Sequence, residues 1–205
     1  CLMATQDLGQ FDIKMTNVVV DWDGAYGHDQ RAFLRCGDGS HNQTVNFTAT
    51  GCTIDVSDTT KTKGMHIMAK VSGEFKLNDT DILAPVAATE MYTNKGTATI
   101  TPDVDSRFVR VYKVATANEF ATVLKVGEKA NASTEDVIIK LVADIELTDF
   151  VTINNINGKN ITIDGKNENG RYTLTMNTSV QSILVSQKNG NITFQNMNMI
   201  HGGSS

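Results

Sequence analysis

The residues best suited to chemistry gather in one short stretch that reads DWDGAYGHD. Its acids, Asp21, Asp23 and Asp29, carry carboxylate oxygens, which Ca²⁺ prefers as ligands. Its aromatic residues, Trp22 and Tyr26, offer flat faces on which a sugar ring can stack. The spacing of a complete EF-hand is absent, so a glycine-rich turn with solvated acids stands as the alternative to a calcium site.

Histidines and cysteines add no metal motif. The four histidines are scattered, without an HxH or HExxH pattern, and we expect them to be solvated rather than catalytic. They are His28, His41, His66 and His201. The three cysteines form no CxxC motif, so a zinc site is not predicted. The sequence therefore leaves oxygen ligands and aromatic faces as its candidate chemistry.

The cysteines have two further interpretations. Cys36 and Cys52 could form a disulfide and leave Cys1 odd, but we expect small buried apolar residues instead. Cys1 could also carry the lipid anchor of a processed lipoprotein. Leu2 and Met3 follow it at once and indicate a strand rather than a flexible polar tether, so this anchor is the less favoured alternative.

Length and composition exclude several classes of protein. The chain has 205 residues and a formal net charge of −5, which disfavours sequence-independent binding of nucleic acid. The apolar runs fall short of a membrane span, and we find no hydrophobic segment of a signal peptide. These values predict one globular domain with a sizeable core.

The elements that position the candidate residues are short strands in a repeat. Apolar and polar residues alternate with a period of two, so that Ile13 and Met15 face inward, as do Ile192 and Phe194. Proline is nearly absent, with two in the chain, so strand ladders can run without interruption. Each such coil cannot bury its inner face alone, and stacking the coils makes one continuous core.

Five corner residues end corresponding strands of this repeat. They are Asn17, Gly51, Asp79, Gly165 and Asn196, with spacings of 34 and 28 in the first group and 31 in the second. These spacings lie in the range of solenoid repeats. Gly, Asn and Asp tolerate a left-handed backbone, which lets one strand bend sharply into the next.

This repeat of short strands and corner residues resembles the right-handed parallel β-helix of the pectate-lyase-like folds. The resemblance covers about 160 residues. The phrases NGKNITIDGKNENGRYTLTM and NGNITFQNMNMIHGG carry the resemblance. It implies an all-β fold, a right-handed parallel β-helix with one short capping α-helix. It also implies a secreted or cell-surface location.

A helix that could cap the solenoid lies in mid-chain. A capping box occupies 116–119, with Thr at the N-cap and Glu three residues later. Phe120, Val123 and Leu124 recur at helical spacing, and Gly127 can end the helix. The resemblance implies that this helix covers the first coil.

A capping helix is expected before the first coil, but here it lies in mid-chain. We therefore predict one β-helix domain, 1–205, in which the coils follow one another in a rotated order along the sequence. The segment 111–130 is then the capping helix and 131–205 the first coils, whereas 1–83 holds later coils and 84–110 the last strands and the join. A circular permutation, natural or engineered, explains this order. A window cut from tandem β-helix domains, or a native order with an internal helix, are the alternatives.

The resemblance implies two kinds of enzyme, and the sequence matches neither well. In a lyase, Asp21 or Asp23 would hold Ca²⁺ and Arg35 would act as the base. A hydrolase would need a pair of carboxylates about 5–9.5 Å apart. The phrases that mark either active site are missing, so catalysis is the alternative, and fold alone does not establish function.

We therefore expect a non-catalytic, adhesin-like module that binds a polysaccharide or a host or cell-surface glycan. Trp22, Tyr26 and Arg35 are its candidate ligand-binding residues, beside the candidate calcium ligands. A polysaccharide lyase or glycoside hydrolase is the first alternative. The second alternative is a structural or engineered circular permutant, a chain that serves as a scaffold and has no ligand of its own. Strand edges at the end coils also predict end-to-end self-association.

Overall fold

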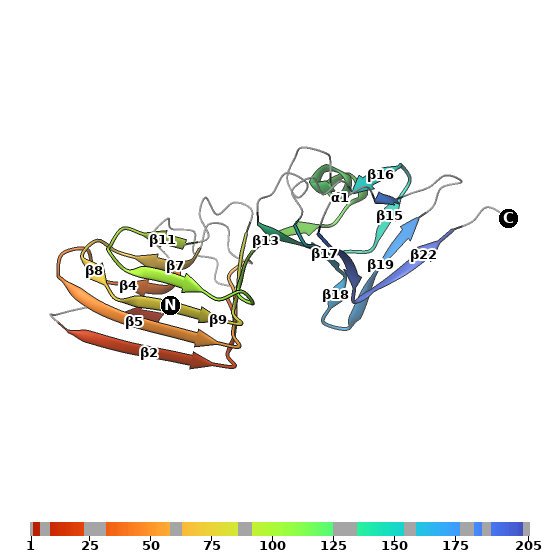
Figure 1. Cartoon of the computed structure of the whole chain (residues 1–205). Coiled ribbons are helices and arrows are strands. Elements are labelled where there is room, and N and C mark those ends of the chain that lie inside the picture. Colours follow the sequence, from red (N-terminus) through yellow and green to blue (C-terminus); the bar gives the residue numbers. More distant parts are fainter. Residues whose placement is uncertain are drawn as a thin grey trace. The chain divides into compact units, whose positions relative to one another are not determined.

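The structure, a computed structural model, describes residues 2–4, 9–22, 32–57, 63–85, 92–124, 135–153, 159–176, 183–185 and 190–202. The described strands form a β-solenoid of about five turns, and their pairing is mostly parallel. The predicted all-β parallel solenoid is therefore confirmed (Figure 1). The chain divides into two compact units, 1–110 and 111–205.

Three sheets surround the core of the first unit. The first sheet runs β1-β4-β7-β11, with bounds Leu2–Ala4, Ala32–Cys36, Lys63–Ile67 and Tyr92–Asn94. The second runs β2-β5-β9-β12, with bounds Gln10–Thr16, Gln43–Thr50, Glu74–Asn78 and Thr99–Pro102, and β8 (Val71–Ser72) also pairs with β5. The third runs β3-β6-β10-β13, with bounds Val19–Asp21, Thr53–Asp55, Asp81–Pro85 and Arg107–Val114. Each coil contributes one strand to each sheet, as a solenoid requires.

The register of the second sheet follows the predicted repeat. Ile13 lies beside Phe47, and Phe47 lies beside Phe75 in the next coil. Both phenylalanines are fully buried, and their ring centroids are 6.1 Å apart. Buried residues alternate with half-buried or exposed ones along β5 and β9, which confirms the period of two. Stacked apolar columns of this kind form the core of the first unit.

Corner residues turn the second sheet into the third. Asn17, Gly51 and Asp79 have φ angles of 54°, 63° and 46°, in the left-handed region, as predicted. The Asn17 N–H donates to the Thr50 carbonyl at 2.9 Å, and the Gly51 N–H donates to the Asn78 carbonyl at 3.0 Å. The corners therefore continue the hydrogen-bonded ladder from coil to coil.

Strand β13 spans the boundary at residue 110, and its sheet continues with strands of the second unit. This part of the sheet runs β13-β14-β17-β21, and the strands after β13 are Asp136–Leu141, Ile161–Asp164 and Ile192–Gln195. Another runs β15-β19-β18 with β22 beside β19; their bounds are Ile145–Leu147, Gly170–Met176, Lys166–Asn167 and Met197–His201. The last pairs β16 with β20, Val151–Ile153 with Ile183–Val185. Strands β18 and β19 pair antiparallel.

Two corners of the second unit differ in conformation. Asn196 has a φ of 51°, as predicted for a corner. Gly165 is not in the left-handed region, so that part of the prediction is wrong. A Cβ added at Gly165 would lie 2.6 Å from the Met197 Cβ and 3.0 Å from the Asn196 carbonyl oxygen. Glycine is required there because the next coil approaches closely, and not because the backbone turns left-handed.

The predicted helix is present as α1 (Ala117–Leu124). The Glu119 N–H donates to the Thr116 hydroxyl at 3.2 Å, and the Thr116 N–H donates to the Glu119 carboxylate at 3.2 Å, which confirms the capping box. Phe120, Val123 and Leu124 are buried in the core of the second unit. Gly127 lies outside the described residues.

The single domain over 1–205 and its rotated order stay predictions. Cys36 and Cys52 are both free and buried, so the predicted small buried residues are confirmed at these positions and the alternative disulfide is not formed. Burial raises the pKa of the Cys36 thiol to about 12.

Candidate functional site

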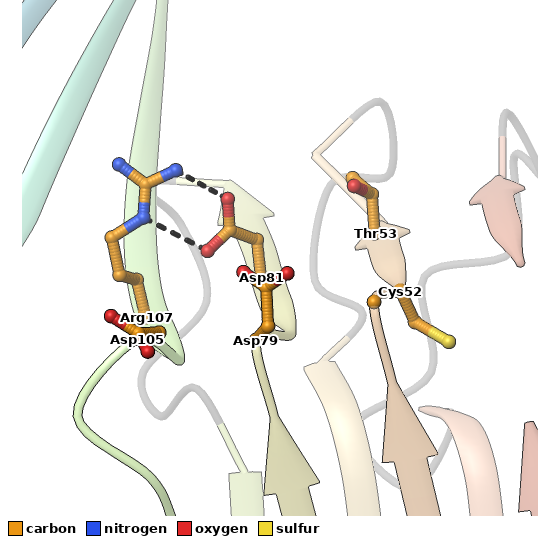
Figure 2. A pocket seen from close by; sticks show the side chains of 7 residues that line it. Cys52, Thr53, Asp79, Asp81, Asp105 and Arg107 are labelled. Atoms are coloured by element: carbon orange, nitrogen blue, oxygen red, sulfur yellow. Dashed lines mark hydrogen bonds and ion pairs between the residues drawn. The ribbon is translucent and has the colours of Figure 1, made fainter. Parts of the chain in front are cut away.

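A polar cleft of about 620 Å³ lies on the outer face of the third sheet of the first unit. It is lined by Gly51, Cys52, Thr53, Asp79, Asp81, Asp105 and Arg107 (Figure 2). Thr53 and Asp81 lie side by side in the register of β6 and β10, and Arg107 begins β13. Three successive coils therefore each contribute a polar side chain to one row.

An ion pair forms one wall of the cleft. The Arg107 Nε donates to the Asp81 carboxylate at 2.9 Å, and its Nη2 donates to the second carboxylate oxygen. Figure 2 shows the two side chains pointing toward one another. A bidentate guanidinium–carboxylate pair fixes the orientation of both planar groups.

The turn beside the cleft is held by Asp103. Its carboxylate accepts from the Ser106 hydroxyl at 2.8 Å, from the Ser106 N–H at 2.8 Å and from the Asp79 N–H at 3.1 Å. These bonds, the one from the Ser106 hydroxyl foremost, hold the pKa of Asp103 below its usual value. The Thr80 N–H also donates to the Ser106 hydroxyl at 3.0 Å. The corner at Asp79 and the turn before β13 are thus tied together.

The cleft can recognise a ligand rich in hydroxyl groups. Carboxylates accept hydrogen bonds and the guanidinium donates them, so together they match the donor and acceptor of a sugar hydroxyl. Three carboxylates and one guanidinium line the cleft, which leaves it acidic. That balance disfavours an anionic ligand and favours a neutral or cationic one.

A second, smaller cavity lies in the second unit, between α1 and the strands β15 and β16. Its volume is about 240 Å³, and its lining includes Asn118, Thr148 and Asp149. The remaining lining residues are small or aliphatic. This cavity offers fewer charged groups than the cleft of the first unit.

The sequence-predicted site residues do not come together among the described residues. Asp21 ends β3, is exposed and lies beside Asp55, which places it on the same sheet as the cleft but not in its lining. Trp22 is half-buried and packs against the core of the first unit. Asp23, Tyr26 and Asp29 lie outside the described residues.

Arg35 lies on a different sheet from Asp21. It occupies β4, is half-buried, and is flanked in register by Met3 and His66. His66 is 2% exposed, so the expectation that the histidines are solvated is wrong at this position. His41 fits that expectation, because it is exposed and its Nδ1 lies 2.8 Å from the Asp38 carboxylate.

Within the described part of the chain, no group of three or more His, Cys, Asp or Glu side chains could hold a metal ion. Two of the three predicted calcium ligands lie outside that part, so the calcium site stays a prediction. None of the described helices is long and apolar enough to cross a membrane.

The acids of the cleft were missed by the sequence analysis, except for Asp79 as a corner residue. A signal was present in NDTD and DVDSR, two acidic stretches about one coil apart. Extending the repeat by 26 residues would have aligned Asp105 with Asp79 and Arg107 with Asp81. The ion pair itself is a contact between coils, and sequence spacing alone does not select it.

No protein-family model matches this chain, and comparisons with curated proteins and with solved structures find no match either. What is shown for this chain is its fold class, a mostly parallel β-solenoid.

Proposed function

We propose that this chain is a carbohydrate-binding β-solenoid module of a secreted or cell-surface protein, and that it does not catalyse a reaction. One observation carries the proposal. The cleft over β6, β10 and β13 holds three carboxylates and a guanidinium in a space of about 620 Å³, in the range of small-ligand sites, and the Asp81 carboxylate is fixed by its pair with Arg107.

The charge of the cleft narrows the class of glycan. Asp79, Asp81 and Asp105 carry three negative charges against the single positive charge of Arg107. A polyuronate would meet net repulsion there, whereas a neutral glycan or an amino sugar would not. We therefore propose a neutral or amino-sugar glycan as the ligand.

The architecture supports an extended ligand. Parallel strands repeat outward-facing side chains at the coil spacing of about 4.8 Å, so a row of polar groups can follow a polymer. The row Thr53, Asp81 and Arg107 has this arrangement. The resemblance to pectate-lyase-like folds supports the extracellular location, and it is an argument from analogy.

Retention on immobilised polysaccharides tests the proposal. The panel contains neutral glucans, mannans and galactans, chitosan as the amino-sugar polymer, and pectate and alginate as the acidic ones. Each is run with Ca²⁺ and with a chelator. We expect retention on one or more neutral or amino-sugar polymers, independent of Ca²⁺, and no oligosaccharide release by mass spectrometry.

Variants locate the binding. Arg107→Gln and Asp81→Asn each remove a charged hydrogen-bonding group, which costs about 1.5–3 kcal/mol and thus roughly tenfold or more in affinity. The matched control is Glu74→Gln. It breaks an exposed ion pair on another sheet, in which Glu74 Oε2 lies 3.0 Å from Lys76 Nζ. Equal binding by all three variants would move the site elsewhere. Release of unsaturated, chelator-sensitive products would instead make the chain a calcium-dependent lyase.

A further inference from the structure

Two cations lie side by side on the hairpin of the second unit. Strands β18 and β19 pair antiparallel, with Lys166 in register with Arg171 and Asn167 in register with Gly170. Figure 1 shows the two strands joined by a tight turn. Residues directly opposite in an antiparallel pair share one face, with Cβ atoms about 4.5–5.5 Å apart. The Lys166 ammonium and the Arg171 guanidinium can therefore contact one common group.

This placement is unfavourable for the folded chain by itself, because like charges directly opposite one another destabilise a strand pair. Both residues are exposed. Within the described part of the chain, neither side chain forms an ion pair. A bound anion would relieve the repulsion between them.

The acids closest in sequence are engaged elsewhere or unpaired. The Asp164 carboxylate accepts from the Lys166 N–H at 3.0 Å. It also accepts from Gln195 Nε2 at 3.0 Å and from Asn196 Nδ2 at 3.1 Å, which hold it against the next coil. Glu168 is exposed in the turn and, among the described residues, forms no ion pair. The pair of cations therefore keeps its charge available to a ligand.

Backbone hydrogen bonds fix the hairpin that carries the pair. The Asn169 N–H donates to Asn167 Oδ1 at 2.9 Å within the turn. The Tyr172 N–H donates to the Gly165 carbonyl at 2.7 Å, at the base of the hairpin. Only the two side chains have to be ordered when a ligand binds, which keeps the entropic cost of binding low.

The charge of the second unit suits an anion better than that of the first. Of the 18 Lys and Arg residues eight lie in 111–205, and of the 23 Asp and Glu residues nine lie there. The first unit holds the other ten cations and fourteen acids. An anion is therefore repelled less at this hairpin than at the acidic cleft.

We propose that Lys166 and Arg171 bind a tetrahedral oxyanion, a phosphate or sulfate group, between them. The guanidinium can donate two parallel N–H bonds to two of its oxygens, and the ammonium acts on another oxygen as a point charge. A dianion matches two cations, whereas one carboxylate would leave a positive charge unbalanced. The site is separate from the cleft of the first unit and does not depend on the function proposed for it.

Titration with inorganic phosphate tests the site, at constant ionic strength and with acetate as the monoanion for comparison. We expect saturable NMR shifts of the backbone amides of 166–171 with phosphate and with sulfate, and much smaller ones with acetate. Phosphate should also raise the unfolding temperature, because it binds the folded chain. Shifts spread evenly over the chain, or equal shifts with acetate, would overturn the proposal.

Variants of the pair locate the binding. Arg171→Gln and Lys166→Gln should each weaken phosphate binding roughly threefold or more. Lys166→Glu should abolish it and should raise the unfolding temperature without phosphate, because a carboxylate there attracts Arg171 across the strands. The matched control is Lys76→Gln, which removes an exposed lysine of the first unit that lies 3.0 Å from Glu74 Oε2. It should bind phosphate as the wild type does, and equal binding by all the variants would refute the site.

Retention on immobilised dextran sulfate, with dextran as the neutral polymer, distinguishes the two sources of the oxyanion. Retention that Lys166→Glu abolishes would assign the site to a sulfate carried by a polymer. Saturable phosphate binding without retention would assign it to a free ion. Charged residues on an edge strand can also serve only to prevent pairing with another chain. In that case the wild-type chain would bind neither phosphate nor dextran sulfate at this hairpin, which would overturn the proposal.

Discussion

The two units of the chain build their cores in different ways. In the first unit, three sheets enclose stacked side chains, with Phe47 and Phe75 fully buried at the centre. In the second, the apolar side of α1 supplies Phe120, Val123 and Leu124 to a core that is otherwise mainly aliphatic. The same repeat of short strands therefore forms its core from stacked coils in the first unit, and from stacked coils together with a helix in the second.

The corners of the two units differ as well. Gly51 turns with a φ of 63° in the first unit, whereas Gly165 is needed in the second because Met197 and the Asn196 carbonyl lie so close. The same residue type at matching repeat positions therefore meets two physical demands, one from backbone conformation and one from space.

Removing a central ring from each core gives the largest expected effect. Phe47→Ala and Phe120→Ala each delete a side chain that is 0% exposed. Each should cost its own unit about 3–5 kcal/mol of stability. Hydrogen exchange read by mass spectrometry during urea unfolding should show lost protection in the mutated unit only. Equal loss in both units would mean that the two cores unfold as one.

Alanine at the two corner glycines should separate their roles. Gly165→Ala forces a Cβ against the next coil, at 2.6 Å from the Met197 Cβ, and should cost about 1–3 kcal/mol by overpacking. Gly51→Ala puts a side chain at a φ of 63°, which costs about 1–2 kcal/mol. Its Cβ would also lie 2.6 Å from Asn17 Oδ1, but that atom is the movable end of a side chain, whereas the atoms near Gly165 include a backbone carbonyl oxygen.

Asparagine distinguishes these two mechanisms, because it tolerates the left-handed conformation. Gly51→Asn should regain much of the stability that Gly51→Ala loses, and Gly165→Asn should regain none. Thermal unfolding of the four variants measures this ranking. Recovery at both positions would show that Gly165 is a conformational corner after all.

The helix that distinguishes the second unit depends on its cap. Thr116→Ala removes the hydroxyl that accepts from the Glu119 N–H and should cost about 1 kcal/mol, confined to the second unit. Thr116→Ser keeps the hydroxyl and should remain close to the wild-type stability. Chemical denaturation of both variants checks the prediction, and a loss of similar size in Thr116→Ser would point to the methyl group instead.

Acid should produce the smallest difference, located in the first unit. Hydrogen bonds from the Ser40 N–H and from the His41 side chain and N–H lower the pKa of Asp38 from 3.8 to about 2. The unfolded chain therefore takes up a proton at this site before the folded chain does. The stability that Asp38 contributes is present above pH 4 and is lost as the pH falls toward 2.

A pH titration of the Asp38 carboxyl chemical shift by NMR should measure this low pKa directly. The variant Asp38→Asn should remove its share of the acid dependence, while Asp105→Asn serves as a control in the exposed turn between β12 and β13. A midpoint near 4 for Asp38 in the folded chain would refute the hydrogen-bonded arrangement around it.

Much of the fold could be predicted from particular residues. The alternation around Ile13, Phe47 and Ile192 gave the inward faces, because a strand has a strict period of two. The capping box at Thr116 and Glu119 gave the start of the helix, because its bonds are local in sequence. The candidate site was harder. Trp22, expected to be a sugar-stacking residue, packs on the core, and Arg35 lies on another sheet than Asp21.

The sequence by itself therefore determined the strands, the left-handed corners at Asn17, Gly51 and Asp79, and the capped helix. Each of these depends on interactions within a few residues or on a short period. Only the tertiary structure decided the cleft with its pair of Asp81 and Arg107, the burial of His66, and the close approach at Gly165. These features join residues of different coils, and the spacing between coils varies with loop length, so their contacts are set by how the coils stack.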